Sequence, residues 1–116
     1  MHIDFSTGLT DVYGEPLKNG IATVTLKHVT IEALMGMSDE DKGITGEEKV
    51  NRHKLARLIA SNPDRSMKAE DVALIKKLIA RGYGPAVVGP AWAILDGEAP
   101  EPKSMAAEAH VNGAAS

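Results

Sequence analysis

Three basic side chains recur at helical spacing in the middle of the chain, and they carry its most specific chemical signal. Lys49, His53 and Arg57 are each four residues apart, so a helix would place them in one line along its surface. Arg52 lies beside this line in the sequence. A row of cations suits the phosphates of a nucleic acid or an acidic protein surface. We therefore expect Lys49, Arg52, His53 and Arg57 to contact a partner.

The distribution of charge around this row favours a protein partner over a nucleic acid. Residues 49–81 hold nine Lys or Arg and three Asp or Glu, whereas residues 1–48 hold three and nine. The whole chain is nevertheless acidic, with a net charge of -3. The break expected at 61–66 contains Pro63 and is longer than the turn of a helix-turn-helix motif. Nucleic-acid binding therefore stays open but is not favoured.

A second candidate surface lies near the single tryptophan. Apolar residues at 87, 88, 91, 92 and 95 have helical spacing, which predicts a helix over 85–95. Gly89 and Pro90 are expected to kink or interrupt it. If the kink exposes Trp92, then Trp92 and Val88 would form an apolar contact patch for a partner.

Several kinds of chemistry have no matching residues. The chain has no cysteine, which excludes a disulfide scaffold, a thiolate metal site and a cysteine nucleophile. The acidic run at 39–43 does not have the ligand spacing of a calcium loop, and the glycines match no phosphate-binding motif. His28 and Glu32 have the spacing of a surface pair on a helix. We expect no enzyme activity, no metal and no cofactor.

The elements that must position these residues follow from hydrophobic periodicity. Alternation predicts strands over 2–6 and 21–25, with a short one at 12–13. Helical spacing predicts helices over 26–36, 46–60, 67–81 and 85–95, and the first three are expected to be capped by Thr25, Thr45 and Ser66. In the second helix an apolar arc is expected from Val50, Leu55, Leu58 and Ile59.

These elements predict a single α+β domain over 1–97: a small antiparallel N-terminal sheet followed by a bundle of about four helices. Residues 98–116 are rich in Ala, Pro and Glu, which predicts a flexible tail. No apolar run approaches the length of a membrane span, and no signal peptide opens the chain. We expect a soluble protein of the cytoplasm with no membrane partner.

Five segments of this layout resemble small proteins from the late gene clusters of tailed bacteriophages and prophages. They are DVYGEPL (11–17), TLKHVTIEAL (25–34), GEEKVNRHKLA (46–56), AEDVALIK (69–76) and YGPAVVGPAW (83–92). Within that group the chain is similar to tail assembly chaperones, which combine a small N-terminal sheet, a helical body and an Ala/Pro/Glu-rich tail. The group has no sharp motif, so no residue role carries over.

The resemblance implies a non-catalytic phage protein that acts by protein–protein interaction in the bacterial host cytoplasm. Tail assembly chaperones bind tape measure and tail tube subunits, so phage proteins are the expected partners. Two alternatives stay open: a small phage regulator that binds nucleic acid or a host protein, and a structural virion component for head–tail joining or decoration. The sequence does not define the partner or the oligomeric state.

Overall fold

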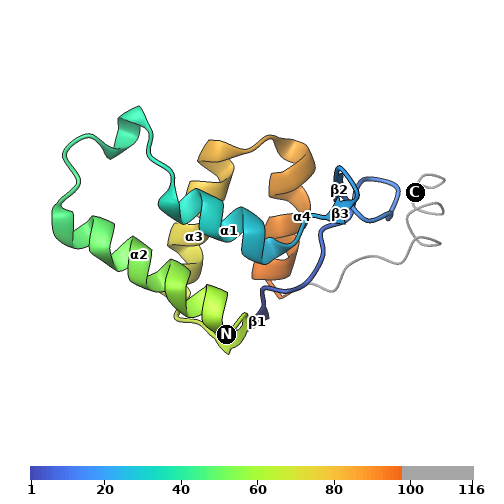
Figure 1. Cartoon of the computed structure of the whole chain (residues 1–116), viewed down its shortest axis with the longest axis horizontal. Helices are drawn as coiled ribbons and strands as arrows, with labels where there is room; N and C mark the ends of the chain where they lie inside the picture. The colour runs from blue at the N-terminus through green and yellow to red at the C-terminus, as the bar shows by residue number, and fades with distance from the viewer. Residues whose placement is uncertain (98–116) are drawn as a thin grey trace.

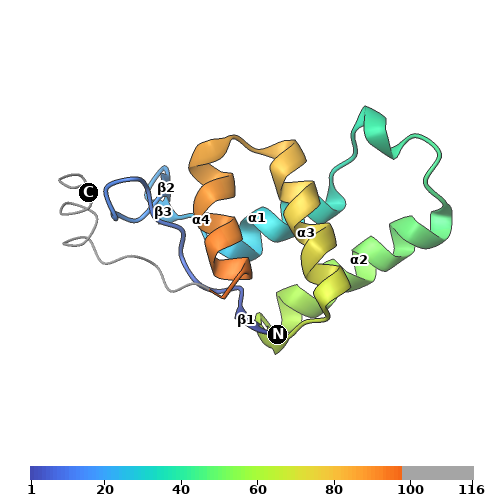
Figure 2. The ribbon, with the colours of Figure 1, turned by 180° about the vertical axis from the view of Figure 1, so that it is seen from behind.

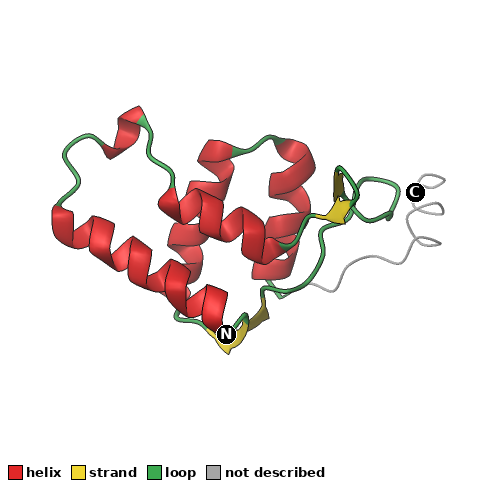
Figure 3. Ribbon diagram, in the orientation of Figure 1, coloured by secondary structure: helices red, strands yellow, loops and turns green. Residues whose placement is uncertain are grey.

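The computed structural model describes residues 1–97, so the predicted tail over 98–116 lies outside the described part of the chain. Within it, four α-helices and four short strands confirm the α+β class, with a small antiparallel sheet near the N-terminus (Figures 1 and 3). The strands are β1 (His2–Asp4), β2 (Lys18–Asn19), β3 (Ala22–Thr23) and β4 (Asp64–Ser66). The helices are α1 (Leu26–Met35), α2 (Gly46–Ser61), α3 (Ala69–Gly82) and α4 (Pro85–Leu95), with a 3-10 turn, η1 (Asp39–Asp41), between α1 and α2.

Two helices begin at the threonines that the sequence predicts. The Thr25 hydroxyl accepts a hydrogen bond from the His28 amide at 3.2 Å, and α1 begins at the next residue. The Thr45 hydroxyl accepts from the Glu48 amide at 3.0 Å at the start of α2. Each bond satisfies an amide that has no partner inside the helix, which explains why both starts were predictable from local sequence.

The start of α3 differs from the prediction. Ser66 does not cap this helix; Lys68 is the capping residue, and no side-chain hydrogen bond is made there. The reason is that Ser66 belongs to β4, which pairs antiparallel with β1 so that Ile3 lies opposite Arg65. The predicted first strand therefore pairs with a segment that follows α2, a partner that the sequence analysis did not identify.

The second two-stranded sheet is a hairpin of β2 and β3, in which Asn19 lies opposite Ala22. Gly20 has a φ of +71° in the turn, where glycine is favoured because it has no Cβ. The predicted strand over 21–25 is thus shorter, and residues 12–13 form a turn rather than a strand. The hairpin lies at the end of the molecule opposite η1 (Figure 1).

The helices pack around α1, which contacts α2 on one side and α3 on the other, while α4 packs against α3 (Figures 1 and 2). The core is mostly aliphatic and includes Phe5, Leu26, Ile59, Ile75 and Leu95. Of the four residues expected to form an apolar arc on α2, only Leu55 and Ile59 lie on its buried side. Because α2 packs chiefly through one face against α1, Leu55 and Ile59 are buried whereas Val50 and Leu58 are exposed.

The last helix is not interrupted at Gly89 and Pro90, where a kink or an interruption was expected. It runs from Pro85 to Leu95 with Gly89 and Pro90 inside it. Pro85 stands in the first turn, where its missing N–H costs no helical hydrogen bond. Ala91 and Leu95, one turn apart, are fully buried, so packing holds the second half of the helix against the body. None of the helices in the described part of the chain is long and apolar enough to cross a bilayer.

Candidate partner-binding surfaces

The outward side of α2 carries four basic side chains, which we call the basic face: Lys49, His53, Lys54 and Arg57. All four side chains are exposed. Lys49, His53 and Arg57 follow one another at steps of four residues, and Lys54 lies three residues before Arg57, so all four share one side of the helix. Within residues 1–97, none of them forms a hydrogen bond or ion pair through its side chain. The basic face is therefore available to a partner with negative charge.

Arg52 does not belong to this face, although the sequence analysis grouped it there. Its side chain is 9% exposed and points to the opposite side of α2. Its Nη1 donates to Asp41 at 3.2 Å and its Nε donates to Glu48 at 3.3 Å. A guanidinium so enclosed needs internal partners, so Arg52 joins α2 to the preceding loop.

Two large aliphatic side chains lie among the cations. Val50 is 51% exposed and Leu58 is 46% exposed. Val50 is one helical turn from Lys54, and Lys54 is one turn from Leu58. The outward side of α2 thus combines cationic ends with exposed hydrocarbon, a mixture found at the cores and rims of protein interfaces.

Val88 and Trp92, the second predicted contact surface, lie on α4, which packs against α3. Val88 is half-buried against the core. Trp92 is also half-buried, and its indole Nε1 donates to the Lys76 carbonyl at 3.1 Å. The Lys76 ammonium lies 4.4 Å from the centre of the Trp92 ring and 2.7 Å from the Asp96 carboxylate. Trp92 is therefore largely engaged by its own chain.

The six residues predicted to bind a partner do not form one surface. Lys49, His53 and Arg57 lie on α2, whereas Val88 and Trp92 lie on α4, with α1 and α3 between the two helices (Figures 1 and 2). The outward side of α2 has the larger share of exposed and unpaired side chains. We therefore take it as the principal candidate surface.

An ion cluster behind α2 was missed from the sequence. Arg81, at the end of α3, donates to both oxygens of Asp41 at 2.9 Å, and Arg52 adds a third bond. The Ser38 amide also donates to Asp41. Hydrogen bonds from Arg81 and Ser38 are the main reasons that the pKa of Asp41 is lowered from 3.8 to about 2. The spacing Ser38-x-x-Asp41 is a capping-box signature and was the available signal.

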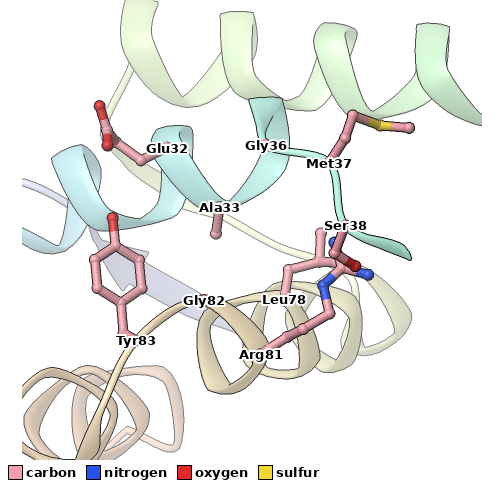
Figure 4. Close-up of a pocket in the computed structure, with 9 residues that line it drawn as sticks. All are labelled: Glu32, Ala33, Gly36, Met37, Ser38, Leu78, Arg81, Gly82 and Tyr83. Carbon is pink, nitrogen blue, oxygen red and sulfur yellow. The ribbon is translucent and has the colours of Figure 1, made fainter. Parts of the chain in front are cut away.

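A groove of about 300 Å³ lies between the C-terminal ends of α1 and α3. Figure 4 shows Glu32 and Tyr83 at one end and Arg81 with Ser38 at the other, with Ala33, Leu78 and Gly82 along its length. Burial is the main cause that raises the pKa of Tyr83, and the negative charge of Glu32 adds to it. The expected His28–Glu32 pair is not formed among the described residues.

Two further observations complete the description of these surfaces. Among residues 1–97 there is no group of three or more His, Asp or Glu side chains arranged to hold a metal ion. No protein-family model matches the sequence, and neither curated proteins nor solved structures give a match.

Proposed function

We propose that this protein acts by binding, and that the outward side of α2 docks onto an acidic surface of a partner protein. One observation carries the proposal: four exposed basic or histidine side chains share a helix face with exposed Val50 and Leu58, and no part of residues 1–97 covers them. Cations arranged this way speed association and select an acidic partner. The aliphatic side chains supply apolar area that a partner would remove from water.

The composition of this surface supports a protein partner rather than a nucleic acid. Val50 and Leu58 offer nothing to a phosphate, and α2 carries no Phe, Tyr or Trp on which a base could stack. Glu47 lies in the first turn of the same helix, and Asp39 and Glu40 are exposed in the segment before it. These carboxylates would repel a phosphate backbone near the N-terminal end of α2.

The more specific proposal is a tail assembly chaperone of a tailed phage. It is supported by the resemblance of five sequence segments to small late-cluster phage proteins. The partner would then be a tape measure or tail tube subunit with an acidic surface. A chaperone of this kind works in the host cytoplasm and is absent from the finished particle, whereas a head–tail joining or decoration protein would remain in it.

Site-specific crosslinking tests the proposal. Ala60 is exposed three residues after Arg57, so a photoreactive benzoylphenylalanine at this position would lie on the outward side of α2. We expect irradiated, infected cells to give one protein adduct. The double variant Lys49→Glu/Arg57→Glu should lose it. The double variant Lys68→Glu/Lys77→Glu should retain it, because it changes the net charge equally at exposed residues outside α2.

The other outcomes separate the alternatives. An adduct with nucleic acid, weakened steeply by added salt, would contradict a protein partner and favour a small regulator. An adduct that survives both double variants would show that the basic face does not take part. Mass spectrometry of purified virions decides the finer point, since many copies in the particle would rule out a chaperone and indicate a structural component.

A further inference from the structure

The groove between α1 and α3 carries a second inference, which does not depend on the basic face of α2. Its floor and walls combine apolar side chains, Ala33, Leu78 and Met37, with a few polar groups at the two ends. Its volume of about 300 Å³ is at the lower end of the range of about 300–1,000 Å³ that ligand pockets occupy. A groove of this size suits one long side chain better than a large cofactor.

The unpaired charge in the groove is negative. At one end, the Arg81 guanidinium is paired with Asp41 through two hydrogen bonds of 2.9 Å. At the other end, the exposed carboxylate of Glu32 has no hydrogen bond or ion pair with any residue in the range 1–97. A bound group would therefore meet an uncompensated carboxylate at the Glu32 end.

The backbone adds to this negative potential. The C-terminal end of α1 reaches the groove at Gly36, and its last turn contains no basic residue. The carbonyl groups at the end of a helix carry the negative end of its dipole, which attracts cations. The C-terminal end of α3 converges on the same groove, where Arg81 already faces it. The C-terminal end of α1 is therefore the place in the groove where a cation from outside could bind.

The Tyr83 ring completes the site. It is half-buried beside Glu32 and follows directly after α3 (Figure 4). A cation gains energy over an aromatic ring, and the hydrocarbon stem of lysine or arginine packs well against apolar walls while its charged end stays near water. A carboxylate, a ring and an apolar channel together are the complement of such a side chain.

We infer that this groove binds a lysine or arginine side chain of a partner polypeptide, with Glu32 as its charge partner and Tyr83 as the ring beside the cation. The stem of the side chain lies along Ala33 and Leu78. Gly82 lines the groove, and a Cβ added there would meet no atom within 4 Å beyond its chain neighbours and the backbone of its own helix. A larger side chain at Gly82 therefore has room, and because Gly82 lines the groove we expect it to occupy part of that space.

The test is a ¹H–¹⁵N NMR titration of the full chain with the peptides Ac-Ala-Lys-Ala-NH₂ and Ac-Ala-Arg-Ala-NH₂. We expect saturable shifts at the amides of Gly36, Gly82 and Tyr83, with roughly millimolar affinity because the ligand is small and flexible. Ac-Ala-norleucine-Ala-NH₂ keeps the stem without the charge and should bind several times more weakly. 1,5-Diaminopentane supplies the cation without a polypeptide and should not bind more tightly than the lysine peptide.

Two variants and two matched controls complete the design. Glu32→Gln should weaken the lysine peptide about threefold to fivefold, as expected for an exposed ion pair, and Gly82→Met should abolish the shifts. Glu70→Gln and Gly89→Met make the same changes at exposed positions outside the groove, and should bind as the parent does. All four variants should remain folded by thermal unfolding.

Three results would overturn the inference. The first is the absence of saturable shifts at Gly36, Gly82 and Tyr83 with either basic peptide. The second is equal affinity for the lysine and norleucine peptides together with no effect of Glu32→Gln, which would make the groove merely apolar. The third is tighter binding of the diamine than of the lysine peptide, which would indicate a free amine as the ligand.

Discussion

Arg81 holds Asp41 with both arms of its guanidinium group across forty residues of the chain, Nη1 to Oδ1 and Nη2 to Oδ2, each at 2.9 Å. Asp41 is also bonded to Arg52 and to the Ser38 amide. This carboxylate thus joins the loop between α1 and α2 to both α2 and the end of α3. These bonds fix the inner side of α2 to the preceding loop and to α3, while the basic face of α2 remains exposed.

We predict that Asp41→Asn destabilises the fold by far more than Glu48→Gln. The amide keeps the shape of the carboxylate but leaves Arg81 without an anion and Arg52 with Glu48 alone, the kind of loss that costs most. Glu48 is in the same network, but its side chain is 39% exposed, so its loss should cost no more than about 1 kcal/mol. Urea unfolding of the two variants measures the difference. Equal unfolding midpoints would contradict a central role for Asp41.

The lowered pKa of Asp41 predicts a loss of stability in acid. Its pKa is about 2 in the folded chain against 3.8 normally, so the unfolded chain takes up the proton first as the pH falls. The contribution of Asp41 is therefore complete above about pH 4 and declines between pH 4 and pH 2. The pKa of Asp4 is lowered too, by hydrogen bonds from Ser6, so Asp41→Asn is the necessary reference.

Thermal unfolding from pH 6 to pH 2 checks this prediction. The difference in stability between the parent chain and Asp41→Asn should shrink as the pH falls below 4, because Asp4 contributes equally to both. A constant difference across this range would show that the folded-state pKa of Asp41 is not lowered.

Thr30 is a position where a substitution should stabilise the fold. It is fully buried in α1, and its hydroxyl has no hydrogen-bond partner among the described residues. An unsatisfied buried hydroxyl costs free energy, so Thr30→Val should raise the free energy of unfolding by about 1 kcal/mol. Thr30→Ser keeps the hydroxyl and removes the methyl group, so it should destabilise by about 1 kcal/mol. If Val also destabilises, the hydroxyl has a partner after all.

The features that could be predicted from the sequence are those fixed by near neighbours. The starts of α1 and α2 follow from Thr25 and Thr45, whose hydroxyls bond amides three residues ahead. The existence of all four helices follows from apolar spacing, which acts over one or two turns. The predicted bounds of α1, α2 and α4 lie within one residue of the observed ones. The α+β class was predictable for the same reason.

The features that could not be predicted depend on contacts between distant segments. Ser66 is in a strand because β1 pairs with it from the other end of the chain. Arg52 is buried because the segment that carries Asp41 lies against α2, where Asp41 accepts a hydrogen bond from Arg52. The outward side of α2 also depends on packing: an apolar residue is buried only where another element covers it, and α1 covers a single face.

The contrast between the buried and the exposed sides of α2 predicts different effects of two leucine substitutions on stability and on partner binding. Leu55 and Leu58 stand three residues apart on α2, yet Leu55 is buried and Leu58 is 46% exposed. Leu55→Ala should lower the free energy of unfolding by about 2–4 kcal/mol through the cavity that it leaves. Leu58→Ala should lower it by less than about 1 kcal/mol, while weakening the crosslink from Ala60 if α2 is the docking surface. Chemical denaturation of the pair, followed by crosslinking of Leu58→Ala, checks both parts. An equal cost for the two leucines would mean that Leu58 is covered, and a stable Leu58→Ala chain with undiminished crosslinking would place the partner on the cations alone.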